Sequence, residues 1–394
     1  MSHKLAGCSI LFCACVAFSC TTATPIRETG PVRVGMYADF SSTGARDGND
    51  ALKGAQLRVS DINAAGGIGG RPLELIALDM KQSPTEAVKA FTKLVQEDGV
   101  CAVIGSTAAN AGLAVSPVAD LSKVPLVSLS LDDRVTNPDL APENPERAGV
   151  VRPYAFLVQP SALQIASFIA AFATEHFLIQ RYATLSDPAN KVSVIQARAF
   201  ESIVKKAGKV VSASLSMADG DFAALLPKIR AAGVDALFVC GSMDANLIIA
   251  REAHDAGYQS LILGNQAWSA PLLEQAGYAV TNVWFCAGIS PDDAGLADLG
   301  PRFSALFGDM PRPAVVPGYD AMGLVAAAVR KAGSSNPQKV RAALEQTTAY
   351  KCLTGQADMD KKTHRLSTLP VAIMRIVGGA YSSVETRYLP KVGK

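Results

Sequence analysis

Charge is scarce in this chain of 394 residues, and no block of one sign stands out. Lys and Arg total 37 and Asp and Glu total 35, so the formal net charge is +2. Charged residues make up 18% of the chain and hydrophobic residues 49%. Without a basic cluster, the sequence offers neither a nucleic-acid-binding face nor a polybasic membrane patch. We therefore predict a globular protein with no nucleic-acid partner, long enough for two domains.

Motifs for catalysis and metal binding are also missing. The chain has four histidines, and we expect His176, His254 and His364 to be solvated surface residues, the first two on helices and the third in a charged loop. No nucleophile elbow, metal-ligand spacing or phosphate loop is present. We predict that the protein is not an enzyme and uses no metal or cofactor.

Long apolar runs are confined to the N-terminus, and no later run could span a bilayer. Lys4 is followed by an apolar stretch over residues 5–18 and then by Ser19-Cys20, a pattern typical of a secretory signal peptide. A small residue before a cysteine also fits lipoprotein processing. We predict a signal peptide over residues 1–19, lipidation of Cys20 and a tether over residues 20–30, which place the protein in the periplasm on a membrane anchor. Cleavage near Ala23 without lipidation is the alternative.

The cysteines outside this segment show no C-x-x-C spacing, so redox or metal chemistry lacks support. Cys101, Cys240 and Cys286 lie in apolar, strand-like runs, where a cysteine behaves as a small hydrophobic residue. We expect buried free thiols. The alternative is one disulfide, such as Cys286 with Cys352, because the compartment is oxidising.

Strands and helices alternate from Val32 onward, which predicts α/β sheets with helices on both faces. The alternation is interrupted by a loop rich in proline and charge over residues 132–153 and then restarts, so we predict two lobes. The first half has expected strands at 32–38, 73–79, 102–104 and 126–129, and helices at 51–64, 85–97 and 111–121. The second has expected strands at 182–185, 210–215, 236–240 and 261–264, and helices at 162–175, 192–207, 222–232 and 245–256.

A run of four glycines marks one corner between a helix and a strand. The segment Asp61-Ile62-Asn63-Ala64-Ala65-Gly66-Gly67-Ile68-Gly69-Gly70-Arg71-Pro72-Leu73 passes from helical spacing of apolar residues to alternating spacing. Glycine allows the left-handed backbone angles that such a reversal needs. The corner predicts a parallel sheet, but it lies at the edge opposite the strand ends where ligands bind.

Several motifs together resemble the leucine/isoleucine/valine-binding family of type I periplasmic binding proteins. They are Val32-Arg33-Val34-Gly35, Ser42-Thr43-Gly44, Val103-Ile104-Gly105-Ser106, the run from Phe222 to Ile229, Gly233-Val234-Asp235 and Tyr319-Asp320-Ala321 at an expected helix start. The resemblance spans nearly the whole mature chain.

The resemblance implies two lobes, each an open, mainly parallel sheet, joined by a three-segment hinge. We expect crossings near 156–159, 285–288 and 355–358, so that lobe 1 comprises residues 31–157 with 287–355 and lobe 2 comprises 158–286 with 356–394. Such a hinge permits clamshell closure on a ligand. The implied partners are a small molecule and a membrane transporter of the ABC or another type, and we expect a monomer.

The expected strand ends and the resemblance together indicate which loops contact the ligand, because ligands bind beyond the carboxyl ends of the strands in an open α/β sheet. The first lobe would contribute Asp47, Ser106, Thr107, Asn110, Ser130, Leu131 and Asp132, and the second Lys191, Ser242, Gln266 and Trp268. Asp132 would repel a bound carboxylate unless it is protonated or paired. Gln266 falls where the family pattern has a glutamate, which removes the counter-ion for an ammonium group.

These departures predict a ligand other than a standard branched-chain amino acid, either more apolar or not zwitterionic. Two alternatives stay open. One is an ordinary amino-acid-binding receptor, and the other is a ligand-sensing or regulatory envelope lipoprotein that contacts another protein.

Overall fold

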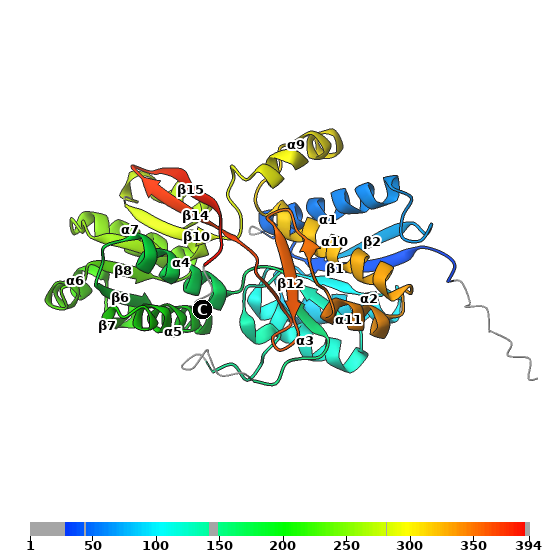
Figure 1. The fold of residues 1–394 in the computed structure, drawn as a ribbon, viewed down its shortest axis with the longest axis horizontal. Helices are drawn as coiled ribbons and strands as arrows, with labels where there is room; N and C mark the ends of the chain where they lie inside the picture. Colours follow the sequence, from blue (N-terminus) through cyan, green and yellow to red (C-terminus); the bar gives the residue numbers. More distant parts are fainter. Residues whose placement is uncertain (1–27, 43–44, 142–148, 281, 391–394) are drawn as a thin grey trace, which may run out of the picture.

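Two lobes lie side by side, each built around one sheet (Figure 1). The computed structural model describes residues 28–42, 45–141, 149–280 and 282–390. The predicted signal peptide and Cys20 lie outside these residues. Within them, no helix combines the length and hydropathy needed to cross a membrane.

The first sheet has eight strands among the described residues, in the order β11-β12-β13-β5-β4-β3-β1-β2. Its parallel part runs from β13 to β2, and β11, β12 and β13 pair antiparallel. The strands are β1 (Val32–Ala38), β2 (Leu73–Asp79), β3 (Val103–Gly105), β4 (Leu126–Ser128), β5 (Ala155–Leu157), β11 (Tyr350–Lys351), β12 (Gln356–Asp360) and β13 (Arg365–Ser367).

Helices cover both faces of this sheet because its strands β1, β3, β4 and β5 carry apolar residues on both sides. On β1, Val34 and Met36 pack with one set of helices, whereas Tyr37 packs with the other set. The first set is α1 (Arg46–Ala64), α10 (Val315–Ala332) and α11 (Pro337–Glu345), and the second is α2 (Pro84–Gln96) and α3 (Ala109–Ser122).

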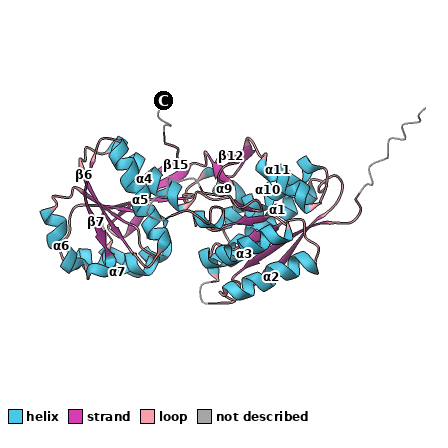
Figure 2. Cartoon of the chain, turned by 90° about the horizontal axis from the view of Figure 1, so that it is seen from below, coloured by secondary structure: helices cyan, strands magenta, loops and turns pink. Residues whose placement is uncertain are grey.

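The second sheet has seven strands in the described part of the chain, in the order β15-β14-β10-β9-β8-β6-β7. Figure 2 shows its strands between α6 and α7 on one side and α4 and α5 on the other. The strands are β6 (Arg181–Ser186), β7 (Val210–Ser216), β8 (Ala236–Val239), β9 (Leu261–Gly264), β10 (Val283–Ala287), β14 (Val371–Val377) and β15 (Ala380–Tyr388). The helices are α4 (Ala162–His176), α5 (Lys191–Lys206), α6 (Phe222–Ala231), α7 (Met243–Asp255) and α8 (Ala270–Ala276).

The chain crosses between the two sheets three times. It leaves the first sheet after Leu157, returns after Ala287 through α9 (Ala294–Phe307), and leaves again between Ser367 and Val371. The last crossing lies later than the expected 355–358. The reason is that β12 and β13 form a hairpin whose Arg365 pairs with Leu157 of β5, which keeps residues 356–367 in the first lobe.

Two helix starts also differ from expectation. Helix α1 begins at Arg46 rather than at residue 51, so Asp47 lies in its first turn and not in a loop. Helix α10 begins at Val315, so Tyr319 and Asp320 lie inside the helix. In both cases polar or proline residues precede the apolar periodicity, which hides the first turn.

The glycine corner folds as predicted. Gly66, Gly67, Gly69 and Gly70 all have positive φ, between 61° and 92°. A Cβ at Gly67 would lie 2.1 Å from the Arg71 carbonyl oxygen, so this position requires glycine. The corner connects α1 to β2 and takes no part in the cavity described below.

Candidate functional site

A cavity of about 450 Å³ lies between the lobes, where the three crossing segments meet. This size suits a small organic ligand. The first lobe lines it with Arg46, Asp47, Asp50, Thr107, Leu129, Leu131, Arg312, Pro313, Ala314, Val316, Pro317, Asp320 and Thr354. The second lobe contributes Ile165, Gln266, Ser269, Phe285, Met374 and Tyr381. Residues at or beside the crossings are Val158, Gln159, Pro160, Ala287, Gly288, Ile289, Pro291 and Leu369.

Most of the cavity wall is aliphatic or aromatic. Leu129 and Leu131 come from the segment after β4, Phe285 and Met374 come from neighbouring strands of the second sheet, and Ile165 comes from α4. Burying an apolar ligand surface against such side chains favours binding in rough proportion to the area.

The charged residues of the cavity all belong to the first lobe. Asp50 is buried, and its carboxylate accepts hydrogen bonds from Arg312 Nε at 2.8 Å and from Arg312 Nη2 at 2.5 Å. This bidentate pair offsets the charge of Asp50 within the protein. Asp47 is open to solvent, but the surrounding protein and the nearby Asp50 raise its pKa. Arg46 reaches Glu274 of α8 at 3.9 Å, an exposed ion pair between the lobes.

Asp320 is the cavity carboxyl group whose pKa burial shifts most. It is buried within α10, and loss of water raises its pKa to about 7. The hydrogen bond from the Leu353 backbone N–H and the charge of Arg58 act in the opposite direction but do not restore the ordinary value. The cavity therefore contains a carboxyl group that is largely protonated below neutral pH.

Two carboxamides of the described residues line the cavity. Gln159 donates from Nε2 to the Leu129 carbonyl oxygen at 2.5 Å. Gln266, in the 3-10 turn η3 (Gln266–Trp268) after β9, accepts at Oε1 a hydrogen bond of 2.9 Å from Gln196 Nε2.

Of the residues predicted to bind the ligand, Asp47, Thr107, Leu131 and Gln266 line the cavity. They arrive from α1, from the segment after β3, from the segment after β4 and from η3. Parallel strands deliver their carboxyl ends to one edge of a sheet, and this explains why residues far apart in the sequence meet here.

The other predicted first-lobe residues serve the loops themselves. Ser106 is buried and accepts from the Ala108 N–H, and Ser130 is buried and accepts from the Asp132 N–H. Asp132 is buried and paired, since Oδ1 accepts from Arg134 Nε at 2.9 Å. That pair removes the repulsion we anticipated for a bound carboxylate. Asn110 is exposed on the first turn of α3 and does not line the cavity.

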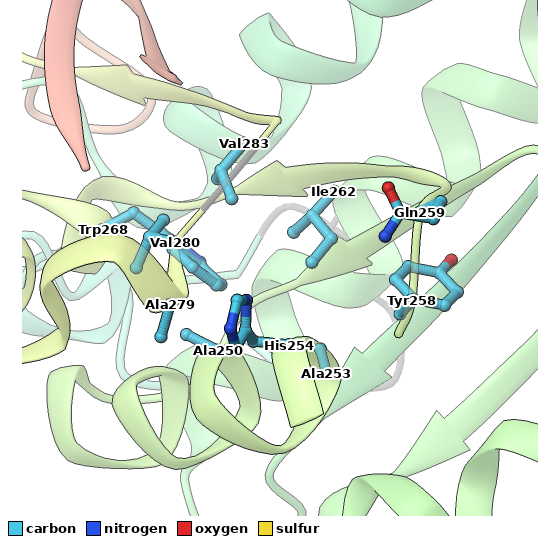
Figure 3. Close-up of a pocket in the computed structure, with 10 residues that line it drawn as sticks. All are labelled: Ala250, Ala253, His254, Tyr258, Gln259, Ile262, Trp268, Ala279, Val280 and Val283. Carbon is cyan, nitrogen blue, oxygen red and sulfur yellow. The ribbon is translucent and has the colours of Figure 1, made fainter. Parts of the chain in front are cut away.

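Three predicted second-lobe residues also lie away from the cavity. Lys191 is the exposed first residue of α5, and Ser242 caps α7 by accepting from the Ala245 N–H. Trp268 is fully buried, and its Nε1 donates to the Val239 carbonyl oxygen at 3.1 Å. Trp268 instead borders a void of about 30 Å³ inside the second lobe, beside Ile262, Val280 and Val283 (Figure 3). That space suits one water molecule at most.

His364 differs most from its predicted surface role. It is fully buried, stacks on Phe156 with ring centroids 4.4 Å apart, and lies within hydrogen-bonding distance of Glu345 and the Ala155 carbonyl. The hairpin of β12 and β13 places His364 beside β5, because Arg365 pairs with Leu157. His176 and His254 are exposed as expected.

The cysteines follow the prediction of buried thiols. Cys101, Cys240 and Cys286 are buried, Cys352 is half-buried, and all four are free. Burial raises the pKa of the Cys101 and Cys240 thiols to about 12. In the described part of the chain, no group of three His, Cys, Asp or Glu has a metal-binding arrangement.

Sequence reasoning missed several cavity residues, among them Gln159, Arg312, Asp320 and Tyr381. Gln159 lies inside the expected crossing at 156–159, and this position could have identified it as a cavity residue. Asp320 stands in an apolar helix, and Tyr381 lies on a strand that the periodicity did not reveal.

Comparisons with known proteins give a consistent picture. Residues 31–380 match a family described as periplasmic binding protein. A Leu/Ile/Val-binding protein homolog 3 from Brucella melitensis is 28% identical over 256 residues, which cover 64% of this chain and 66% of that protein, just under two thirds. A leucine-, isoleucine-, valine-, threonine- and alanine-binding protein from Pseudomonas aeruginosa is 25% identical, with 84% of this chain and 86% of that protein covered.

Solved structures show the same two-lobed architecture. The branched-chain amino acid transporter substrate-binding protein LivJ from Streptococcus pneumoniae, in complex with isoleucine, superposes with a TM-score of 0.71 at 25% identity. The match covers 90% of this chain and 99% of that chain. The predicted fold of two mainly parallel sheets flanked by helices is confirmed.

Proposed function

This chain belongs to the periplasmic binding protein family, and we propose that it captures a small ligand between its lobes and delivers it to a membrane transporter. The observation that carries the proposal is the interlobe cavity of about 450 Å³, which both lobes and all three crossings line. A ligand that touches both walls stabilises the closed arrangement, because it makes those contacts together only there.

The cavity chemistry favours an apolar ligand over a zwitterion. No acidic side chain of the described second-lobe residues lines the cavity. In the first lobe, Asp50 is engaged by Arg312, and Asp320 has a pKa of about 7. An ammonium group buried against the second lobe would lack a counter-ion, which is costly. We therefore infer a ligand with an apolar body and without an ammonium group.

An ordinary branched-chain amino acid is the second candidate. Relatives that carry Leu/Ile/Val-binding names support it, and Asp47 supplies an accessible carboxylate on the first-lobe wall. An ammonium group would then face the first lobe.

The family supports the periplasmic localisation, and the N-terminal sequence supports the anchor. We propose a periplasmic protein that is anchored through lipid on Cys20, since the N-terminal segment has signal-peptide and lipoprotein features. The mass of the mature N-terminal peptide tests this: a diacylated or triacylated Cys20 supports it, and an unmodified N-terminus near Ala23 contradicts it.

Thermal unfolding with matched ligands separates the two candidates. A ligand present at 100 times its Kd adds about 2.7 kcal/mol to the free energy of unfolding. We expect 4-methylpentanoate, which is leucine without its ammonium group, to raise the melting temperature more than leucine or isoleucine does. A larger shift with leucine would overturn the apolar proposal in favour of the amino acid. Small-angle scattering should show a smaller radius of gyration when the stabilising ligand is present.

A further inference from the structure

Four carboxamide side chains form a continuous chain of hydrogen bonds behind the second-lobe wall of the cavity. Asn246 on α7 bonds to Asn265 at 3.1 Å, Asn265 bonds to Gln196 on α5 at 2.8 Å, and Gln196 bonds to Gln266 at 2.9 Å. Asn246 and Gln196 are fully buried, and Asn265 is 2% exposed. Gln266 is half-buried and lines the cavity, so the chain runs from the interior to the ligand site.

Backbone groups fix the orientation of the two asparagine amides in this chain. The Gly241 N–H donates at 2.9 Å to Asn246, so the accepting atom must be Oδ1 and the Asn246 Nδ2 must point onward. Asn265 Oδ1 takes that bond and also one from the Ala267 N–H at 3.2 Å. Asn265 Nδ2 donates to the Gly241 carbonyl at 3.0 Å and to Gln196 Oε1. Exchanging O and N in either asparagine would place donor against donor or acceptor against acceptor.

The direction set in the interior determines what Gln266 presents to the cavity. Because Gln196 Oε1 accepts from Asn265, Gln196 Nε2 must donate, and it donates to Gln266 Oε1. Gln266 is left with its Nε2 protons. Among the hydrogen bonds of the described residues, none has Gln266 Nε2 as its donor. The second-lobe wall therefore offers a donor held in one orientation.

We propose that Gln266 determines ligand specificity by donating to a carboxylate or carbonyl oxygen of a mainly apolar ligand, and that Gln196 is the positioning residue that holds it. This inference rests on the proposed function and adds the polarity of the ligand group that meets the second lobe. An ammonium group there would face Nε2 and find no acceptor. Turning Gln266 to offer Oε1 would strand the buried Gln196 donor, at a cost corresponding to roughly 5- to 150-fold in affinity.

The test uses pairs of probes that share a skeleton and differ in one group. The first pair is 4-methylpentanoate and 3-methylbutylamine, and the second is 3-phenylpropanoate and 2-phenylethylamine. The ketone 5-methylhexan-2-one shows whether a neutral carbonyl group binds as well as a carboxylate does. Titration calorimetry on the mature protein should show at least about tenfold tighter binding of the acid than of the amine in one or both pairs, as one buried hydrogen bond and its desolvation require.

Gln266→Glu is the decisive variant. The new carboxylate still accepts from Gln196, but its second oxygen now faces the cavity, so the preference should invert toward the amine. Gln338→Glu is the matched control, because Gln338 is exposed on α11 of the first lobe and the charge change is the same. If Gln266→Glu does not fold, Gln266→Met removes the donor without adding charge. This variant should weaken binding of the acid about tenfold and leave the affinity for the amine unchanged.

Gln196→Met tests the positioning role. Gln266 becomes free to turn, so the gap between acid and amine should narrow, with the amine binding more tightly than before. If Gln196 had only a structural role, the variant would weaken binding of the acid and of the amine by similar factors. An acid preference that survives Gln266→Glu in folded protein, or an amine preference in the unmodified protein, would overturn this inference while leaving ligand capture intact. If no probe binds, both the inference and the apolar form of the proposed function fail.

Discussion

The buried carboxyl of Asp320 should make the stability of the protein depend on pH in a predictable direction. Its pKa is about 7 in the folded chain, against an ordinary value of 3.8, because the surrounding protein excludes water. Below about pH 4 the group is protonated in both states and contributes nothing. Between about pH 4 and pH 7 the unfolded chain releases this proton and the folded chain keeps it, so the free energy of unfolding falls as the pH rises. Above about pH 7 the loss is constant.

The magnitude follows from the two pKa values. A carboxyl that moves from 3.8 to about 7 on folding costs about 4 kcal/mol once it is ionised in both states. The groups around Asp320 are Arg58 of α1, Tyr350, Cys352 and the Leu353 N–H. Among them, only Arg58 and the Leu353 N–H favour the ionised form.

Asp320→Asn removes the titration and nearly preserves the shape. We expect the stability advantage of the variant over the unmodified protein to grow by about 4 kcal/mol from pH 4 to pH 8 and then to level off. Urea unfolding, followed by far-UV circular dichroism at a series of pH values, measures this difference. Circular dichroism is preferable to tryptophan fluorescence because Trp268 and Trp284 both lie in the second lobe.

Glu28→Gln provides a control of opposite sign. Hydrogen bonds from Ser334 and Ser335 help lower the pKa of Glu28 to about 2, so this variant should be less stable than the unmodified protein at neutral pH. That deficit should shrink as the pH falls below about 4.5. A difference between Asp320→Asn and the unmodified protein that stays flat from pH 4 to pH 8, or that shrinks, would refute the reasoning about Asp320.

Three further predictions concern the framework around the cavity. Gly318→Ala should lower the free energy of unfolding by about 3 kcal/mol, because its Cβ would lie 1.8 Å from the Ala51 carbonyl oxygen. Gly300→Ala should be nearly neutral in the same urea assay, because its Cβ would meet only the end of the Met310 side chain, at 3.2 Å. Trp268→Phe should cost about 2 kcal/mol through a void and a lost hydrogen bond and leave the order of acid and amine affinities unchanged; an altered order would show that Trp268 contacts ligand. Cys101, Cys240 and Cys286 should resist alkylation until the protein unfolds, since they are buried, and peptide mass mapping of native, iodoacetamide-treated protein would reveal any early modification.

Local signals were enough to predict most of the scaffold. The expected strand at residues 32–38 matches β1 because Val32, Val34 and Met36 alternate along it and are buried on one face of the sheet. The glycine corner was predictable because positive φ at four positions of one reversal leaves little choice of residue. Both features depend on neighbours in the sequence.

The errors arise where a contact depends on the folded backbone and cannot be seen in the sequence. His364 looked exposed in its charged surroundings, but its burial depends on Phe156 and Glu345, which only the fold brings near. Asp132 looked like a free acid, although its partner Arg134 is two residues away, because a turn had to be known before the pair could be seen.

The candidate site was predictable in part for the same reason. Strand ends identified Thr107, Leu131 and Gln266, whereas the amide orientation at Gln266 depends on partners from α5 and α7. No periodicity or motif encodes that direction, because it follows from backbone groups at Gly241 and Ala267.

The most direct test of ligand capture between the lobes is the mass of the molecule that copurifies with the native protein. Native mass spectrometry, followed by release and identification of the bound compound, provides it without a choice of probe. We predict one bound molecule per chain, rich in carbon, bearing a carboxylate or carbonyl and no primary amine. Recovery of leucine, isoleucine or valine would leave ligand capture intact and contradict the inference of an apolar ligand without an ammonium group, whereas protein with no bound molecule would fail to support capture.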